Sequence, residues 1–226
     1  MSLSDNLSTV KQNIQNALNK RGETDCNKVT IVAVTKKRSV EEIDEMVSLG
    51  VTELGENRVQ ELLEKYDKVK GNVNWHLIGT LQKNKVKYIA DKVVMIHSVE
   101  SESLAGEIDK QCKKIGKVMD VLVQVNVSGE ESKSGIRPED AFDFIQKIKD
   151  YSSIRVRGLM TMAPLNEEKS KISKIFEQLY QLSVDISKKK YDNISMEYLS
   201  MGMSNDYDLA VEQGANIVRV GSALFK

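Results

Sequence analysis

Short runs of apolar and β-branched residues alternate with helical patterns along nearly the whole chain. We assign strands to residues 29–35, 52–55, 75–79, 93–98, 119–127, 156–162, 195–200 and 217–221. Strands that alternate with helices form parallel sheets, because each crossover returns the chain to the same end of the sheet. Eight such units within 226 residues favour a single α/β domain, residues 1–226, folded as a closed (β/α)8 TIM barrel. An open doubly wound sheet is the alternative, because local patterns do not show whether a sheet closes.

The helical segments carry recognisable start signals. Ser39 to Glu42 form a capping box that begins a helix directly after the first strand. Pro138 stands where a helix accepts proline in its first turn. A further apolar stripe precedes the first strand and consists of Leu3, Leu7, Val10, Ile14 and Leu18. We therefore expect an extra N-terminal helix that packs on the barrel.

Composition and patterning argue against several classes of function. Lysine plus arginine and aspartate plus glutamate each total 33, and no long basic block indicates a nucleic-acid partner. No stretch has the length of a membrane span or the pattern of an export signal, so we expect a soluble cytoplasmic protein. Cys26 and Cys112 are isolated and are expected to be free thiols. His76 and His97 are the only histidines, and no metal site is expected.

Polar residues follow the predicted strands at their carboxyl ends, where barrel proteins build their sites. They are Lys36, Glu56, Asn57, Gly79, Ser98, Asn126, Ser128, Ser200 and residues 219–222. In the fifth strand, valines occupy one parity, and Gln124, Asn126 and Ser128 occupy the other. We therefore expect these three polar side chains to face the upper interior of the barrel and to line a ligand pocket.

The loops after the last two strands have the composition of a phosphate site. Ser200, Met201 and Gly202 follow the seventh strand, and Gly221 and Ser222 follow the eighth. Glycine lets backbone N–H groups approach an anion, serine adds hydroxyl donors, and barrels often bind phosphate at these two loops. Each glycine alone also fits an ordinary turn, but together the two loops indicate a phosphate monoester.

Lys36 directly follows the first strand. Together with Lys37 and Arg38, it also fits a solvated strand end. The functional interpretation is that a partly desolvated barrel mouth disfavours the ammonium form and leaves an amine that attacks an aldehyde. An aldehyde that carries a phosphate satisfies both this lysine and the two loops.

Ordered motifs over nearly the whole chain carry a family resemblance. They are Val34-Thr35-Lys36, Gly55-Glu56-Asn57-Arg58-Val59-Gln60-Glu61, the block from Trp75 to Lys85, His97-Ser98-Val99, Val125-Asn126-Val127-Ser128, Gly158-Leu159-Met160-Thr161-Met162, Leu199-Ser200-Met201-Gly202-Met203-Ser204 and Val218-Arg219-Val220-Gly221. On these motifs the chain resembles the pyridoxal phosphate homeostasis family, whose fold is similar to the barrel of alanine racemase. The resemblance implies pyridoxal 5′-phosphate (PLP) as cofactor, held as a Schiff base on Lys36. The cofactor-binding set that we assign is Lys36, Asn57, Ser200, Met201, Gly202, Arg219, Gly221 and Ser222.

The resemblance also implies roles within this set. The Ser200 loop and the Gly221-Ser222 loop would hold the phosphate, and Arg219 would face the pyridine nitrogen. The family usually reads Ser-Lys-Thr-Lys-Pro where this chain has Thr35-Lys36-Lys37-Arg38-Ser39. Lys37 therefore remains an alternative amine.

Arg219 also bears on whether the protein is a catalyst. A guanidinium at the ring nitrogen disfavours the pyridinium form and weakens the ring as an electron sink. Related racemases take their second acid/base group, a tyrosine, from a C-terminal β domain, for which these 226 residues leave no room. Tyr198 and Tyr207 fit a strand and a helix instead.

We therefore expect a monomeric PLP carrier with no catalytic residues, which supplies apo PLP-dependent enzymes. A weak amino-acid racemase is the first alternative. A barrel that binds another phosphorylated metabolite without a covalent bond is the second.

Overall fold

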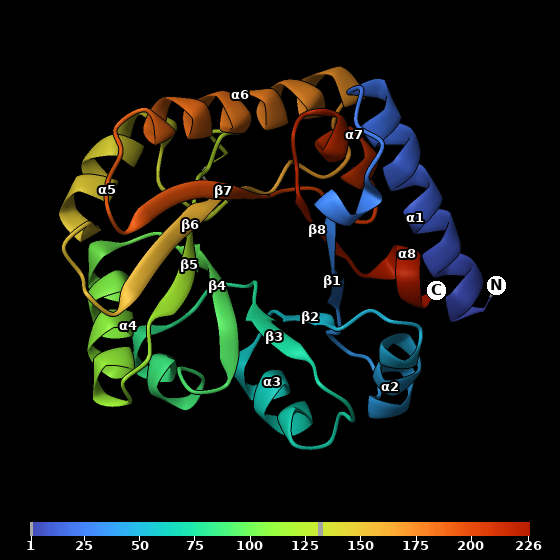
Figure 1. Ribbon diagram of the computed structural model, residues 1–226, viewed down its shortest axis with the longest axis horizontal. Helices are drawn as coiled ribbons and strands as arrows, with labels where there is room; N and C mark the ends of the chain where they lie inside the picture. The colour runs from blue at the N-terminus through green and yellow to red at the C-terminus, as the bar shows by residue number, and fades with distance from the viewer. Residues whose placement is uncertain (1, 131–132) are drawn as a thin grey trace.

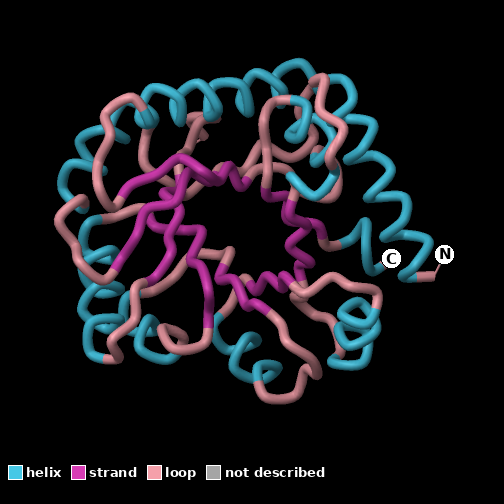
Figure 2. The backbone as a smooth tube through the Cα atoms, in the orientation of Figure 1, coloured by secondary structure: helices cyan, strands magenta, loops and turns pink. Residues whose placement is uncertain are grey.

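The computed structural model describes residues 2–130 and 133–226. Eight parallel strands close into a barrel in chain order. They are β1 (Thr30–Val34), β2 (Glu53–Glu56), β3 (Asn74–Leu77), β4 (Val93–Val99), β5 (Met119–Gln124), β6 (Ile154–Met160), β7 (Ile194–Ser200) and β8 (Ile217–Val220). Figure 2 shows the strands as a ring that is surrounded by helices. The prediction of a closed barrel is confirmed, because β1 pairs with both β2 and β8.

Helices and short 3-10 turns connect the strands. The α-helices are α1 (Leu3–Lys20), α2 (Val40–Ser48), α3 (Val59–Tyr66), α4 (Glu102–Lys114), α5 (Ala141–Ile148), α6 (Lys169–Ser187), α7 (Tyr207–Glu212) and α8 (Ser222–Phe225). The 3-10 turns are η1 (Cys26–Lys28), η2 (Lys83–Tyr88) and η3 (Pro138–Asp140). The predicted capping box of α2 is present, since Ser39 Oγ accepts from the Glu42 N–H and Glu42 Oε2 accepts from the Ser39 N–H.

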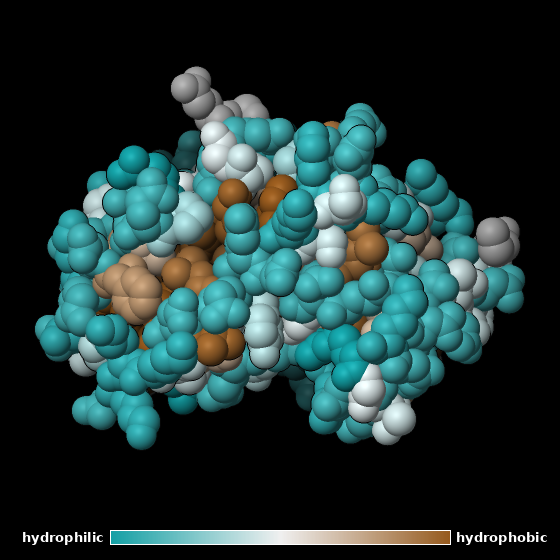
Figure 3. All heavy atoms as spheres, turned by 90° about the horizontal axis from the view of Figure 1, so that it is seen from above, coloured by the Kyte–Doolittle hydropathy of each residue, from teal (hydrophilic) through white to brown (hydrophobic). Residues whose placement is uncertain are grey.

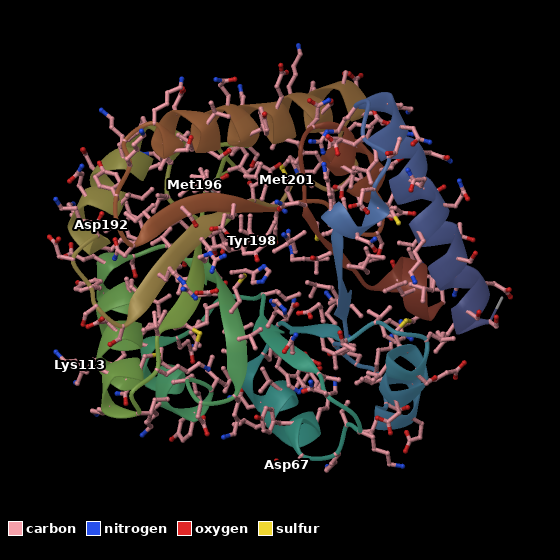
Figure 4. The ribbon with its side chains drawn as sticks, viewed as in Figure 1. Asp67, Lys113, Asp192, Met196, Tyr198 and Met201 are labelled. Atoms are coloured by element: carbon pink, nitrogen blue, oxygen red, sulfur yellow. The ribbon has the colours of Figure 1, made fainter. Side chains whose placement is uncertain are left out.

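The chain packs its apolar residues in two layers. The inner layer fills the barrel with Val32, Val34, Ile78, Met95, Leu122, Met160 and Ile217. The outer layer lies between the strands and the helices and includes Trp75 and Phe176. Strand alternation separates the layers, since Val32 and Val34 belong to the inner one and Ala33 to the outer one. Figure 4 shows this on β7, where Tyr198 points into the barrel and Met196 points toward α6.

The predicted N-terminal helix is confirmed as α1, and it packs beside α7 and α8 (Figure 1). Asn6 Nδ2 donates to the carbonyl oxygens of Leu224, at 3.0 Å, and Lys226, at 2.6 Å. Asn13 Nδ2 donates to the hydroxyl of Tyr207 at 2.8 Å. The first helix therefore covers the outside of the two last strand-helix units.

The fifth strand ends earlier than its sequence predicts. β5 stops at Gln124, and Asn126 organises the following loop. Asn126 Nδ2 donates to the carbonyls of Glu130 and Lys133, and its Oδ1 accepts from Ser128 Oγ and the Gly129 N–H. The expectation that Asn126 and Ser128 face the barrel interior is wrong, because their side chains bond to their own loop, as Asn and Ser often do in turns.

Hydrophilic residues cover most of the molecular face in Figure 3. Within the described residues, no helix combines the length and the apolar character that a membrane span requires.

Candidate functional site

The strands β8, β1 and β2 lie next to one another, so their carboxyl ends meet at one part of the barrel mouth (Figure 1). Val34 at the end of β1 pairs with Gly55 of β2, and a Cβ atom built on Gly221 would lie 3.3 Å from Val34 Cβ. A cavity of about 490 Å³ opens here. Its lining consists of Val34, Lys36, Lys37, Arg38, Asn57, Arg58, Glu61, Gly221 and Ser222. The structure therefore brings together four of the predicted site residues, which are Lys36, Asn57, Gly221 and Ser222.

The lining of this cavity is strongly cationic. Lys36, Lys37, Arg38 and Arg58 stand against the single carboxylate of Glu61. Arg38 is also paired with Glu42 at 3.2 Å, and its guanidinium lies 5.3 Å from the ring centre of Phe225. A concave site lined by one sign of charge concentrates ligands of the opposite sign. The cavity is therefore suited to an anion such as a phosphate monoester.

A buried ion pair holds the backbone just before Lys36. Lys65 Nζ donates to the Thr35 carbonyl at 2.7 Å and to Glu56 Oε1 at 2.6 Å. The Thr35 hydroxyl donates to the same Glu56 oxygen at 2.7 Å. Glu56 and Thr35 are fully buried. Glu56, which the sequence placed in the ring of site residues, therefore anchors β1, β2 and α3 to one another and does not line the cavity.

The backbone just after Lys36 is also held. The Lys37 N–H donates to Glu61 Oε2 at 3.0 Å, and Lys37 has a φ of 59°. A lysine in this left-handed conformation persists only where surrounding contacts hold it. Lys36 is thus fixed from both sides by α3.

The side chain of Lys36 is exposed. The expectation that the barrel mouth partly desolvates Lys36 is therefore wrong for the structure as it stands. The physical reason is that Thr35, the first residue after β1, is the last buried residue, and Lys36 emerges where the cavity opens to solvent.

Hydrogen bonds connect the loop after β7 to the loop after β8. Ser204 Oγ accepts from the Gly221 N–H at 3.1 Å and from the Ala223 N–H at 3.2 Å. The N–H groups of Ser204 and Ser222 have no acceptor among the residues that the structure describes. Free N–H groups and hydroxyls at these loops are the donors that a phosphate requires. Ser204 appeared only within a sequence motif and is a candidate that residue-by-residue reasoning missed.

Gly202 has a second reason to be glycine. Its φ is +90°, and a Cβ atom would lie 2.5 Å from Ala210 Cβ and 2.9 Å from Tyr207 Cα. The close approach of α7 therefore suffices to explain this residue. Its carbonyl accepts from the Arg219 N–H at 3.0 Å, which ties the β7 loop to β8.

Four predicted site residues are buried and do not line the cavity: Ser200, Met201, Gly202 and Arg219. Arg219 is buried and donates to Ser200 Oγ at 2.6 Å and to the Thr161 carbonyl at 2.8 Å. Burial lowers the pKa of Arg219 to about 10, against the opposing charge of Asp206, so it is a cation at neutral pH. Met201 is fully buried, and its N–H bonds to Ile217 O.

The tyrosines do not contribute to the described lining of the cavity. None of the seven tyrosines is among the described residues that line the cavity. Tyr198 packs inside the barrel beneath the Arg157 guanidinium, which is 5.3 Å from its ring centre, and the Tyr207 hydroxyl accepts from Asn13 of α1. An acid/base tyrosine opposite Lys36 is thus not present among the described residues.

Taken with the fold, these features define a class of protein, a (β/α)8 barrel with a lysine in a cationic cavity at the carboxyl ends of its strands. A model of the family described as "Alanine racemase, N-terminal domain" matches residues 6–226. The chain belongs to this family.

Two relatives within this similarity carry the same protein name. A protein of Aquifex aeolicus (strain VF5), 40% identical over 226 residues that cover 100% of this chain and 98% of the relative, is named pyridoxal phosphate homeostasis protein. A protein of Pasteurella multocida (strain Pm70) with the same name is 33% identical, over 100% of this chain and 97% of the relative. The predicted resemblance is confirmed.

Two solved structures share the fold of this chain. PipY of Synechococcus elongatus PCC7942, solved with PLP bound, has a TM-score of 0.86 at 28% identity, and each chain is covered completely. An alanine racemase of Clostridium difficile 630 in complex with cycloserine has a TM-score of 0.75 at 20% identity, with 97% of this chain and 59% of the racemase covered. The second comparison shows the shared barrel alone.

Proposed function

We propose that this chain binds PLP as a Schiff base on Lys36 and serves PLP homeostasis by storing and supplying the cofactor. One observation carries the proposal: Lys36 lines a cationic cavity together with Asn57, Gly221 and Ser222. The names of the relatives and the PLP-bound PipY structure support the choice of cofactor.

The residues present fit each part of PLP. The Lys36 amine, in its neutral form, would hold the aldehyde carbon of PLP as an imine, with loss of water. The N–H groups of Ser204 and Ser222, with the cations of the cavity, would hold the phosphate. Arg219, held by Ser200 and Thr161, is the group that the family resemblance directs at the ring nitrogen. When bound, PLP would supply an electrophilic aldehyde carbon and a conjugated ring that can delocalise negative charge.

The chain's own residues favour holding the cofactor over catalysis. Arg219 stays protonated at neutral pH, which disfavours a second positive charge on the ring nitrogen. No tyrosine lines the cavity among the described residues, so the acid/base tyrosine that the related racemases use has no counterpart in this lining. We assign no catalytic residue.

Two alternatives remain open. Weak amino-acid racemisation would appear as D-alanine formed from L-alanine by the purified protein and lost in Lys36→Ala. Non-covalent binding of another phosphorylated metabolite would leave the protein without an imine absorption band in the presence of PLP.

Absorption spectroscopy tests the proposal. Protein incubated with PLP and freed of excess cofactor is expected to show a visible imine band that borohydride bleaches. Lys36→Ala should lose the band, and Lys37→Ala is the matched control that should keep it. A band that survives in Lys36→Ala and disappears in Lys37→Ala would contradict the assignment of the lysine.

The transfer role is tested separately. We propose that the protein is a cytoplasmic monomer that donates PLP to apo PLP-dependent enzymes. Loaded protein mixed with such an apo-enzyme is expected to restore the enzyme's activity, while the borohydride-reduced protein should not. Retention of all PLP in the presence of excess apo-enzyme would contradict a supply role.

A further inference from the structure

Five side chains from five strands form one line of hydrogen bonds through the interior of the barrel. Glu53 Oε2 lies 2.7 Å from His76 Nε2, and His76 Nδ1 lies 2.9 Å from His97 Nε2. His97 Nδ1 lies 2.9 Å from Ser200 Oγ, which Arg219 contacts at 2.6 Å. The line crosses the barrel between β4 and β7 and so connects β2, β3 and β4 with β7 and β8 (Figure 1). His76, His97, Ser200 and Arg219 are all buried.

The direction of each hydrogen bond follows from the arginine end. The Arg219 guanidinium only donates, so Ser200 Oγ accepts from it. No other acceptor for the Ser200 hydroxyl proton is found among the described residues, and that proton is therefore donated to His97 Nδ1. His97 then carries its own proton on Nε2 and donates it to His76 Nδ1. His76 in turn donates from Nε2 to Glu53.

The glutamate end leads to the same directions. Burial raises the pKa of Glu53, but hydrogen bonds from His76 and Asn74 outweigh it and hold the pKa below its usual range. An ionised carboxylate only accepts, so His76 donates from Nε2. Burial, together with the charge of Arg219, holds the pKa of His97 well below its usual range, so His97 is neutral and can donate from one nitrogen only. The glutamate end thus places a proton on His76 Nε2, and the directions set from the arginine end place the His97 proton on Nε2 as well.

Neither Glu53 nor either histidine is among the residues that line the Lys36 cavity. Arg219 does not line the cavity either, but it is the residue that the family resemblance directs at the PLP ring nitrogen, and it donates to Ser200 Oγ. While the Ser200 proton points at His97 it cannot point at Arg219, so both lone pairs of Ser200 Oγ are free to accept. A neutral His97 accepts that proton at Nδ1 only when its own proton is on Nε2, where it donates toward His76. We propose that Glu53 and His76 are positioning residues, which hold the Arg219 guanidinium in one orientation for bound PLP through His97 and Ser200. This inference rests on the proposed function.

The histidine tautomers provide a first test that needs no cofactor. The chain has only two histidines, so long-range ¹H–¹⁵N spectra of the imidazoles contain four nitrogen signals. At pH 7.5, both rings are expected to carry the proton on Nε2 and a bare Nδ1. An Nδ1–H tautomer at either ring, or averaging between tautomers, would overturn the proposal.

Substitution of Glu53 provides the second test. Glu53→Gln keeps the size of the side chain and removes the obligatory acceptor, so the nitrogen signals of His97 should shift although Glu53 does not touch His97. Release of PLP should accelerate by about fivefold, the factor that corresponds to one ordinary hydrogen bond. Ser200→Ala breaks the same line next to Arg219 and should accelerate release at least as much.

Asn74→Ala is the matched control. Asn74 Nδ2 donates to the other oxygen of Glu53 at 2.6 Å and is outside the line. Its loss should change the release of PLP less than twofold, a smaller effect than loss of a hydrogen bond within the line. Unchanged His97 signals and unchanged release in Glu53→Gln would overturn the positioning role, as would equal effects of the two substitutions. A wild-type protein that forms no imine would instead reject the proposed function, whatever its tautomers.

Discussion

At the residue scale, Lys65 links helix α3 to the strand that carries Lys36. Its ammonium group bonds to the Thr35 carbonyl and to the fully buried carboxylate of Glu56. Both partners lie one residue away from candidate site residues, since Lys36 follows Thr35 and Asn57 follows Glu56. The ion pair therefore joins the folding of the barrel to the geometry of the site.

Lys65→Met should destabilise the protein by about 3 to 5 kcal/mol, because it leaves the Glu56 charge buried without its partner. Urea unfolding of the protein without cofactor measures this free energy. Lys68→Met, at an exposed position of the same segment, is the control and should change stability by less than about 0.5 kcal/mol. The double variant Glu56→Gln/Lys65→Met should recover part of the loss. Equal stability of Lys65→Met and Lys68→Met would contradict the anchoring role.

At the scale of elements, the loop between β7 and α7 depends on a glycine that no side chain can replace. Gly202 combines a left-handed backbone with a Cβ position 2.5 Å from Ala210 Cβ of α7. Gly50 has nearly the same φ, +91°, but no atom lies within 4 Å of its Cβ position. The two glycines therefore separate backbone strain from steric overlap.

Gly50→Ala should lower the free energy of unfolding by about 1 to 2 kcal/mol, the strain of a left-handed alanine. Gly202→Ala should lower it by about 1 to 3 kcal/mol more, because overpacking adds to that strain. Denaturant titrations of the two variants and the wild type give the comparison. A Gly202→Ala variant as stable as Gly50→Ala would mean that α7 moves away without penalty.

Some bounds of the strands and helices were predicted correctly from the sequence, and others were not. Strand positions followed from apolar runs between turn signals, and the capping box located the start of α2 to the residue. The end of β5 was missed, because Asn126 fits a strand by parity and a turn by its side chain, and only the loop's carbonyls decide between them. The His76–His97 contact was also missed, because the pairing of side chains from different strands depends on strand register, which the sequence does not display.

At the scale of the whole molecule, some features of the site were predicted from the sequence and others depend on the tertiary structure. The sequence placed Lys36, Asn57, Gly221 and Ser222 at strand ends, and barrel closure brings them to one cavity. It left open whether Lys36 is solvated or partly desolvated, since the depth of a strand end depends on the lengths of neighbouring loops, and the structure shows Lys36 exposed. Arg58 and Glu61 join the cavity from the start of α3. They stand in a motif already quoted for the family resemblance, but strand-end reasoning alone stopped at Asn57.

The buried histidine predicts how stability depends on pH. The pKa of His97 in the folded protein lies well below the usual value near 6.5, because burial disfavours the imidazolium. Below pH 6.5 the unfolded chain binds a proton that the folded one does not, so stability is complete above that pH and falls with acidification. The expected slope between pH 6 and pH 5 is about 1.4 kcal/mol per pH unit from this residue.

Urea unfolding at a series of pH values measures the slope. His97→Gln keeps a polar side chain without an imidazole and should flatten the slope between pH 6 and pH 5, whatever its effect on absolute stability. Glu53, whose pKa lies below its usual range, loses its own stabilising effect only near and below pH 4.5, outside this window. An unchanged slope in His97→Gln would contradict the neutral buried state of His97.

The central claim is that Lys36 is the residue that binds PLP. Mass spectrometry of protein that has been incubated with PLP and reduced with borohydride tests it most directly. Cleavage after Glu23 and Glu41 yields one peptide that holds both Lys36 and Lys37, and fragmentation distinguishes them. The pyridoxyl adduct is predicted on Lys36. An adduct on Lys37 or on any other lysine, or no adduct at all, would contradict the claim.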